Sequence, residues 1–376
     1  MISRKSINAH AIFWFLMGEP TQEDVIFVVS SVFSIRNTFI SLEKMEFEIS
    51  DSDFKEKFVV LAQKLEPMNL VCFLRKSEGR LLVQVNRIPE SGGRKWLSRV
   101  WIQRILFGVV VAFVMVDGYY RTLGANSVTY IGDPLDFAVL YTFSLVGILG
   151  VHEAGHMVAA KVHKIRTTWP YFIPGIPVIG IPTFGAMIQS RGLTINRDLL
   201  FDVAIAGPLA GLVIAVIVSF YGAYTSPILD NSIARQLEGS LVKLDDSILM
   251  TLALAVFGKA GPDVEVLMSP IMFAAWLGFL ITFLNLLPAW QLDGGHMARS
   301  IFGQRIHRIA TYASVGVLFL LRYEMMAIFI LLFSMKSMDV RPLDDVSPLS
   351  KNRKLAYIAV IAIAALCAPL PFSVWP

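Results

Sequence analysis

Val151-His152-Glu153-Ala154-Gly155-His156 is a His-Glu-x-x-His sequence that lies inside an apolar run from Leu135 to Ala160. On a helix, His152 and His156 lie one turn apart on the same face, so both imidazoles can reach one metal ion. Glu153 follows the first histidine directly, which brings its carboxylate near a water bound to that metal. Ionisable side chains at membrane depth are costly, so three of them within one turn indicate a functional site.

The composition predicts a polytopic α-helical membrane protein. Of the 376 residues, 55% are hydrophobic and only 16% are charged, and the mean hydropathy is +0.61. Soluble proteins carry about 25% charged residues. Cys72 and Cys367 lie far apart in the sequence, which argues against a disulfide framework or a cysteine-based zinc site. The net charge of +4 is typical of Lys and Arg gathered in cytoplasmic loops, so no nucleic-acid partner is expected.

Residues 1–95 differ from the rest of the chain, because they carry charges at an ordinary density and no run long enough to cross a bilayer. The acids after Thr21 predict the start of a helix over 25–33, and helical periodicity predicts a second helix over 53–65. Residues 39–49 are interpreted as one strand, and 71–75 with 81–85 as a hairpin. We therefore expect a small α+β domain over 1–95, a linker at 91–93 and a membrane domain over 96–376.

The membrane domain is expected to contain about seven spans, with six or eight as the neighbouring possibilities. With their flanks, these segments can cross a hydrocarbon layer of roughly 30 Å. They lie at 105–116, 135–163, 202–223, 268–287, 309–321, 325–335 and 357–370. The stretch 248–257 is too short to span and is expected to be interfacial or re-entrant.

Lys and Arg gather on one side of these spans, which predicts the orientation of the chain. They flank the first span at its start, the second at its end and the third at its start, and they fill the segments between spans four and five and between spans six and seven. This asymmetry places the N-terminal domain in the cytoplasm and the His-Glu-x-x-His sequence in the cytoplasmic half of span two. Because no Ser/Arg-rich transit segment is evident, a prokaryotic cell membrane is favoured over a plastid membrane.

A segment rich in proline and glycine follows the second span. Residues 170–189 contain four prolines and three glycines, a density that a straight helix cannot tolerate. One interpretation is an interfacial loop. The interpretation that we favour is a re-entrant, β-like hairpin with an open edge, which pairs with an extended substrate by strand addition. The edge consists of Phe184, Gly185, Ala186, Met187, Ile188 and Gln189.

A third metal ligand is required, because catalytic zinc usually has three protein ligands and one water. The best candidate is Asp293, which follows the break of span four at Pro288 and lies on the same side as the two histidines. Asp202, at the head of span three, is the second candidate. The remaining histidines are weaker candidates: His10, His163 two turns beyond the motif, His296 as an outer partner or exposed, and His307 in a basic loop where solvation is expected.

Three motifs together resemble the site-2 proteases, which are intramembrane zinc metalloproteases. They are His152-Glu153-x-x-His156 within a span, Asn285 followed by Leu292-Asp293-Gly294, and Gly207-Pro208-Leu209-Ala210-Gly211 in the span between. The soluble N-terminal domain, the sequence at 170–174 and Asn196-Arg197 resemble more closely the archaeal, cyanobacterial and plastid subgroup. The resemblance covers about 135–300, the expected catalytic core. The chain departs from the family in having Asn285-Leu286-Leu287-Pro288 where Asn-Pro-x-Pro is commoner.

The resemblance implies an enzyme that cleaves transmembrane segments of membrane proteins in the lipid bilayer. One Zn²⁺ would be held by His152, His156 and Asp293, with Glu153 as general base. Asn285 would donate to the oxyanion. For 207–211 we expect ordinary small-residue packing that brings span three against span two.

A hypothesis from another class is a membrane metal transporter or a metal-binding scaffold that uses the same His152, His156 and Asp293. Transport predicts polar or acidic residues along several spans. Spans one, five, six and seven have almost none, which disfavours a transport pathway.

Overall fold

The computed structural model describes residues 20–40, 44–87, 100–165, 167–178, 181–187, 195–230, 233, 244–261, 264–336 and 342–369. The chain divides into two compact units. The first contains residues 1–93, 193–200 and 341–349, and the second contains 94–192, 201–340 and 350–376. The expected linker at 91–93 lies outside the described residues.

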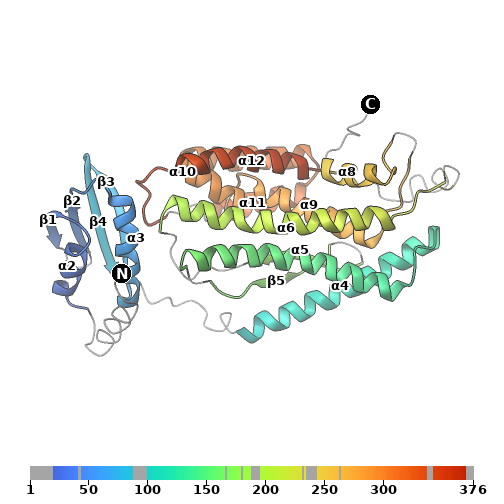
Figure 1. Cartoon of the computed structure of the whole chain (residues 1–376), viewed down its shortest axis with the longest axis horizontal. Helices are drawn as coiled ribbons and strands as arrows, with labels where there is room; N and C mark the ends of the chain where they lie inside the picture. Colours follow the sequence, from blue (N-terminus) through green and yellow to red (C-terminus); the bar gives the residue numbers. More distant parts are fainter. Residues whose placement is uncertain are drawn as a thin grey trace. The chain divides into compact units, whose positions relative to one another are not determined.

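The first unit is built on a four-stranded antiparallel sheet in the order β1-β2-β4-β3 (Figure 1). Its elements are α2 (Gln22–Ser30), β1 (Ile35–Ile40), β2 (Met45–Ile49), α3 (Phe54–Leu65), a 3₁₀ turn (Glu66–Met68), β3 (Leu70–Ser77) and β4 (Arg80–Arg87). Thr21 and Asp24 form a capping box that starts α2. The interpretation of 39–49 as one strand is wrong, because Ile40 faces Met45 in an antiparallel pair and the chain reverses between them.

Two segments distant in sequence complete this unit along its β3 edge. The backbone N–H of Leu74 donates to the carbonyl of Leu343 at 2.9 Å, and that of Asp344 donates to the carbonyl of Ile195 at 2.8 Å. Lys55 Nζ on α3 lies 2.7 Å from Asp198 Oδ2. These contacts occupy backbone groups that an open edge strand would leave unpaired.

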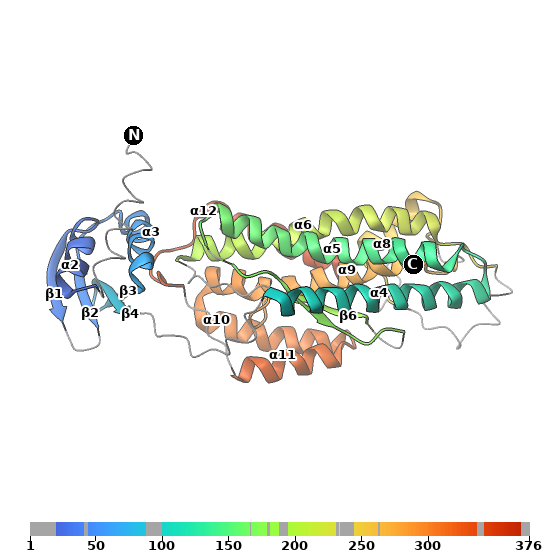
Figure 2. The same ribbon diagram turned by 90° about the horizontal axis from the view of Figure 1, so that it is seen from below.

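The second unit consists mainly of helices (Figures 1 and 2). They are α4 (Val100–Val128), α5 (Pro134–Val162), α6 (Arg197–Thr225, whose first turn belongs to the first unit), α8 (Ile248–Val256), α9 (Pro270–Leu286), α10 (Asp293–Leu320), α11 (Glu324–Lys336) and α12 (Lys351–Cys367). Among the described residues, α4, α5 and α6 are long and apolar enough to cross a membrane. The chain is therefore an integral membrane protein, and these three helices coincide with the first three expected spans.

Helix α9 forms the centre of this unit. Nearly all of its residues are buried, from Pro270 to Leu286. A helix that is apolar on all sides can be stable only when neighbours surround it. At 17 residues α9 is shorter than the three long helices, and it packs against α5 and α12.

Helix α10 differs from the sequence prediction. A basic loop around His307 was expected between the spans at 268–287 and 309–321, but the chain is helical from Asp293 to Leu320 except at Gly303, whose non-helical backbone (φ 77°, ψ 179°) divides the helix in two. Gly294 and Gly295 lie in the first turn of this helix. Arg299, expected in that loop, is only 2% exposed.

The segment rich in proline and glycine forms an antiparallel hairpin. β5 (Tyr171–Pro174) pairs with β6 (Thr183–Met187), with Phe172 opposite Ala186 and an irregularity before Pro174. A side chain at Gly175 would place its Cβ 2.0 Å from the carbonyl oxygen of Ile181, so the hairpin requires glycine there. β5 lies along α4, and β6 approaches α5. Of the expected substrate edge, Ile188 and Gln189 and the side chains of Phe184 and Met187 lie outside the described residues.

The contact between α6 and α9 leads to a test of this packing. A Cβ at Gly222 would lie 2.6 Å from Cα and 2.7 Å from N of Met272. We expect Gly222→Ala to destabilise the protein by about 1–3 kcal/mol, because the obstructing atoms are backbone atoms that cannot rotate away. The measurement is the melting temperature in detergent. Gly124→Ala on α4 is the matched control, since nothing lies within 4 Å of its Cβ position; equal melting temperatures for the two variants would contradict the close contact.

Candidate metal centre

Helix α5 carries three of the candidate residues near its C-terminal end. The helix starts at Pro134, where the Asp133 side chain caps the N-terminus, and continues to Val162 without a break. His152 is 5% exposed and Glu153 is 6% exposed. The imidazoles of His152 and His156 lie on one side, with their Nε2 atoms 3.2 Å apart.

Asp293 reaches the two histidines from the start of α10. Its Oδ2 lies 3.5 Å from Nε2 of His152 and 3.4 Å from Nε2 of His156. The approach depends on the next two residues: a Cβ at Gly294 would lie 2.1 Å from the carbonyl oxygen of Leu286, and one at Gly295 would lie 2.4 Å from that of Ala289. Glycines at both positions let the α9–α10 turn close tightly enough to bring Asp293 to α5.

The three ligand atoms have the spacing that a tetrahedral zinc ion requires. Zinc bonds to His nitrogen and carboxylate oxygen are about 2.0–2.2 Å, so tetrahedral ligands lie about 3.3–3.6 Å apart. The observed separations are 3.2, 3.4 and 3.5 Å. Two imidazoles and one carboxylate also match the ligand types of known catalytic zinc sites. The residues therefore fit a zinc ion.

Helix α6 runs side by side with α5 (Figures 1 and 2) and contacts the two histidines of the cluster. His156 Nδ1 lies 2.7 Å from the carbonyl oxygen of Val203. A carbonyl can only accept, so Nδ1 carries the proton and Nε2 keeps its lone pair for a metal.

Small residues allow α6 to come this close. A Cβ at Gly207 would lie 2.1 Å from Nε2 of His156, and one at Gly211 would lie 3.0 Å from Cβ of His152. Gly155 on α5 faces the carbonyl of Ala206 in the same way, at 2.6 Å. The expected packing role of 207–211 is confirmed, and here the packing determines where the imidazoles can lie.

Asn285 lies in the last turn of α9, beside the cluster. Its Nδ2 is 3.4 Å from Nε2 of His152. The structure therefore brings together all five of the residues that the sequence analysis placed at the metal or the reacting group.

Of the other acid and histidine candidates, Asp202 and His163 lie away from the cluster. His296 lies three residues after Asp293 on α10, and His10 lies outside the described residues. Asp202 accepts hydrogen bonds of 2.6 Å from both Nε and Nη2 of Arg353 on α12, and its Oδ2 lies 3.2 Å from Nε2 of His163. The expectation of a solvated His307 is wrong. It is 2% exposed, and its Nε2 lies 3.0 Å from the carbonyl of Trp290. The reason is that His307 lies on the buried face of α10, whereas Arg305 and Arg308 on the same helix are exposed.

A mostly apolar hollow opens beside Glu153. Its lining comes from α4, α5 and the start of the hairpin: Gln103, Arg104, Phe107, Gly150, Glu153, Ala154, Met157, Trp169, Pro170 and Phe172. Phe107 and Phe172 meet edge to face, with centroids 5.0 Å apart. The α4 residues of this lining could not be predicted from the sequence, because no local pattern indicates that α4 lies against this side of α5.

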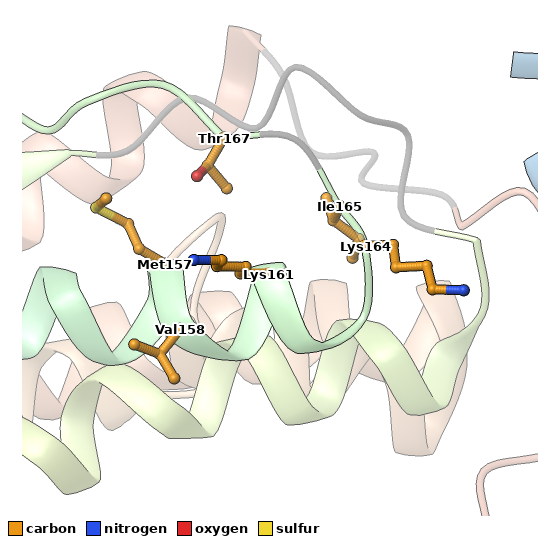
Figure 3. Close-up of a pocket in the computed structure, with 6 residues that line it drawn as sticks. All are labelled: Met157, Val158, Lys161, Lys164, Ile165 and Thr167. Carbon is orange, nitrogen blue, oxygen red and sulfur yellow. The ribbon is translucent and has the colours of Figure 1, made fainter. Parts of the chain in front are cut away.

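A second hollow follows towards the end of α5 and shares Met157 with the first (Figure 3). It is lined by Met157, Val158, Lys161, Lys164, Ile165 and Thr167. In Figure 3 the Lys161 side chain extends towards Met157, whereas Lys164 points away. This hollow contains none of the candidate catalytic residues.

Residues 140–323 match the sequence profile of peptidase family M50. The chain is 31% identical over 239 residues to the probable zinc metalloprotease EGY2, chloroplastic, of Arabidopsis thaliana, an alignment that covers 60% of this chain and 41% of that protein. It is 25% identical over 340 residues to the probable zinc metalloprotease EGY1, chloroplastic, of the same plant, covering 84% and 60%. The EGY2 protein of Oryza sativa subsp. japonica is 27% identical over 292 residues, covering 73% and 51%.

The chain thus spans about half the length of the curated relatives it matches. No solved structure is significantly similar to it. The profile match includes the whole of the metal-ligand cluster, Asn285 and the glycines of α6. The chain carries a peptidase family M50 domain, the domain of the site-2 proteases, and is a homologue of the plastid EGY zinc metalloproteases.

Proposed function

We propose that this protein is a zinc metalloprotease that cleaves membrane-spanning segments of other membrane proteins inside the bilayer. The observation that carries the proposal is the cluster of His152, His156 and Asp293 at zinc-ligand spacing, with Glu153 next to it on an apolar helix. The family match and the names of the relatives support proteolysis over metal transport.

His152 and His156 would hold the zinc through Nε2, and Asp293 through Oδ2. When bound, the metal lowers the pKa of a water towards about 7 and so supplies a nucleophile at neutral pH. The chain's own contribution is to present three ligands from two helices and to fix the tautomer of His156 through Val203.

Glu153 would accept the proton of the attacking water and deliver it to the leaving amine. Its position directly after His152 places the carboxylate at the edge of the ligand cluster. It also lines the apolar hollow between α4, α5 and the hairpin. A peptide bond that enters this hollow would lie beside Glu153.

Asn285 would donate a hydrogen bond from its side-chain amide to the carbonyl oxygen that becomes negative during attack. Its Nδ2 lies 3.4 Å from Nε2 of His152, which borders the space that a substrate carbonyl would occupy. The last turn of the buried helix α9 holds the side chain in place, so little reorganisation is needed during the reaction.

The substrate must be extended when it is cut, because a helical peptide bond is hydrogen-bonded within its own helix. The expected open edge over 184–189, of which 184–187 belong to β6, would receive the unwound segment by strand addition. β6 approaches α5, so such a segment would run beside the helix that carries Glu153. Apolar side chains of the substrate would enter the hollow whose lining includes Phe107 and Phe172.

The proposal includes an arrangement in the membrane. The α+β unit within 1–95 would lie in the cytoplasm, and 96–376 would form the membrane domain with its catalytic core at 135–300 and about seven spans. The hairpin would enter the bilayer as a re-entrant element. The expectation of a prokaryotic cell membrane is not supported, because the relatives carry chloroplast names; we retain only the assignment to a membrane.

The role of Glu153 can be tested with Glu153→Gln, which keeps the shape of the side chain and removes the carboxylate that would act as the base. In lipid vesicles that contain a labelled single-span peptide, we expect the cleavage rate to fall by about 10²–10⁴-fold. Zinc per chain, measured by elemental analysis, should stay at the wild-type level, since Glu153 is not a ligand. A variant that cleaves at the wild-type rate would exclude Glu153 as the general base.

The support from α6 can be tested with Gly207→Ala. The added Cβ would lie 2.1 Å from Nε2 of His156 and would displace the imidazole. We expect a loss of bound zinc after purification, together with the loss of cleavage. Gly147→Ala on α5 is the control, because its Cβ position is open. Full zinc occupancy in Gly207→Ala would show that the imidazole of His156 can move aside and still bind the metal, which would contradict this expectation.

The role of Asn285 can be tested with Asn285→Ala. Removing one oxyanion donor typically lowers kcat by about 10²–10³-fold. We expect that loss with little change in KM and with zinc retained, since the amide would act on the charge that develops during attack. An unchanged kcat would mean that Asn285 contributes to helix packing and not to catalysis.

A further inference from the structure

Asp117 is a buried carboxylate in the long apolar helix α4, outside the metal centre. It is 0% exposed and accepts hydrogen bonds from three different parts of the chain. Its Oδ2 accepts from Nε of Arg121 at 2.6 Å and from the hydroxyl of Tyr141 on α5 at 2.8 Å. Its Oδ1 accepts from the backbone N–H of Val178, between β5 and β6, at 2.8 Å.

Burying charged side chains costs free energy, so this group is expected to have a structural or functional role. A carboxylate inside a membrane span must be paired and hydrogen-bonded to be tolerated. Arg121 provides the opposite charge, and its guanidinium lies over the ring of Phe273 on α9, 3.6 Å from the centroid. Tyr141 precedes His152 by eleven residues, or about 16 Å along α5, so the cluster is not part of the ligand set.

The contact with Val178 indicates which segment Asp117 holds in place. Its φ is +70°, a left-handed conformation that a β-branched residue rarely adopts. Just before it, the hairpin ladder is continued by Gly175 N–H donating to the carbonyl of Pro182 at 3.0 Å and Ile176 N–H to that of Ile181 at 2.9 Å. Asp117 therefore fastens the far end of the hairpin at a strained residue.

The near end of the same hairpin is fastened by the same helix. Gln103 Nε2 on α4 donates to the carbonyl of Trp169 at 3.0 Å, two residues before β5 begins. Gln103 and Asp117 lie fourteen residues apart, or about 21 Å along α4. Two contacts at this distance set both the position and the direction of the hairpin relative to α4.

We propose that Asp117 is a positioning residue for proteolysis, which holds the β5–β6 hairpin in place so that β6 meets an extended substrate without further ordering. The proposal rests on the proposed function for its substrate. A strand that is already ordered costs less to pair than one that must be fixed on binding. Loss of the anchor should therefore weaken substrate binding more than it slows the chemical step.

The first test measures the hairpin directly, in the full chain in lipid vesicles. Ile176→Cys provides a labelling site, because its side chain is exposed and the two native cysteines, Cys72 and Cys367, are buried. A nitroxide at this position should become more mobile in Asp117→Ala, seen as narrower electron paramagnetic resonance lines. Asp117→Asn keeps an acceptor for the Val178 N–H and should restore the wild-type spectrum.

The second test measures cleavage of the same labelled peptide. We expect Asp117→Ala to raise KM at least tenfold, with a smaller change in kcat and with zinc retained. Tyr141→Phe is the matched control, since it removes the α5 partner of Asp117 and leaves the Val178 contact. It should keep both the wild-type spectrum and the wild-type KM.

Either an unchanged nitroxide spectrum or an unchanged KM in Asp117→Ala would overturn the proposal. Equal effects in Tyr141→Phe and Asp117→Ala would also overturn it, because they would mean that Asp117 acts through the packing of α4 against α5. If Asp117→Ala does not fold, Asp117→Leu combined with Arg121→Met replaces the ion pair by apolar side chains and gives the same readouts. If the wild type cleaves no membrane peptide, the proteolytic function fails, and with it the positioning role; the nitroxide spectra then still show whether Asp117 anchors the hairpin.

Discussion

The close contact between α5 and α6 is the constraint on which the candidate site depends. Gly155, Gly207 and Gly211 remove the side chains that would keep the two helices apart. This brings the carbonyl of Val203 within 2.7 Å of His156 Nδ1 and leaves Nε2 facing the other ligands. In a membrane, where lipid is as apolar as leucine, such close backbone packing is a main source of helix association. The same contact therefore holds the helices together and selects the tautomer that can bind a metal.

Two carboxylates in the helices of the second unit are each paired with an arginine. Asp117 is paired with Arg121, and Asp202 is paired with Arg353. Each group joins helices that are distant in sequence: the first links α4 to α5 and the hairpin, and the second links α6 to α12. Asp293 follows the same rule, with two imidazoles as its neighbours and zinc as the proposed partner. The cost of burying a lone charge thus limits the ways in which these helices can pack.

The sequence predicted the parts of the site that are local. Spacing along one helix placed His152, Glu153 and His156 together, and the break of the chain after α9 indicated Asp293. The predictions that were wrong concerned segments whose state depends on distant neighbours. The basic residues between the fourth and fifth expected spans indicated a solvated loop, yet Arg299 and His307 are both buried on α10. Residues 39–49 alternate like one strand, and only the antiparallel pairing of β1 with β2 shows that the chain reverses between Ile40 and Met45.

By itself, the sequence determined a membrane protein with a metal-binding motif inside a span, because hydropathy and helical periodicity are properties of consecutive residues. Only the tertiary structure decided that Val203 orients His156, that Asn285 borders His152, and that Asp117 holds the turn of the hairpin. These three contacts join residues 47, 133 and 61 positions apart. Contacts of that kind depend on how helices pack in three dimensions, and no local pattern in one sequence specifies which faces will meet.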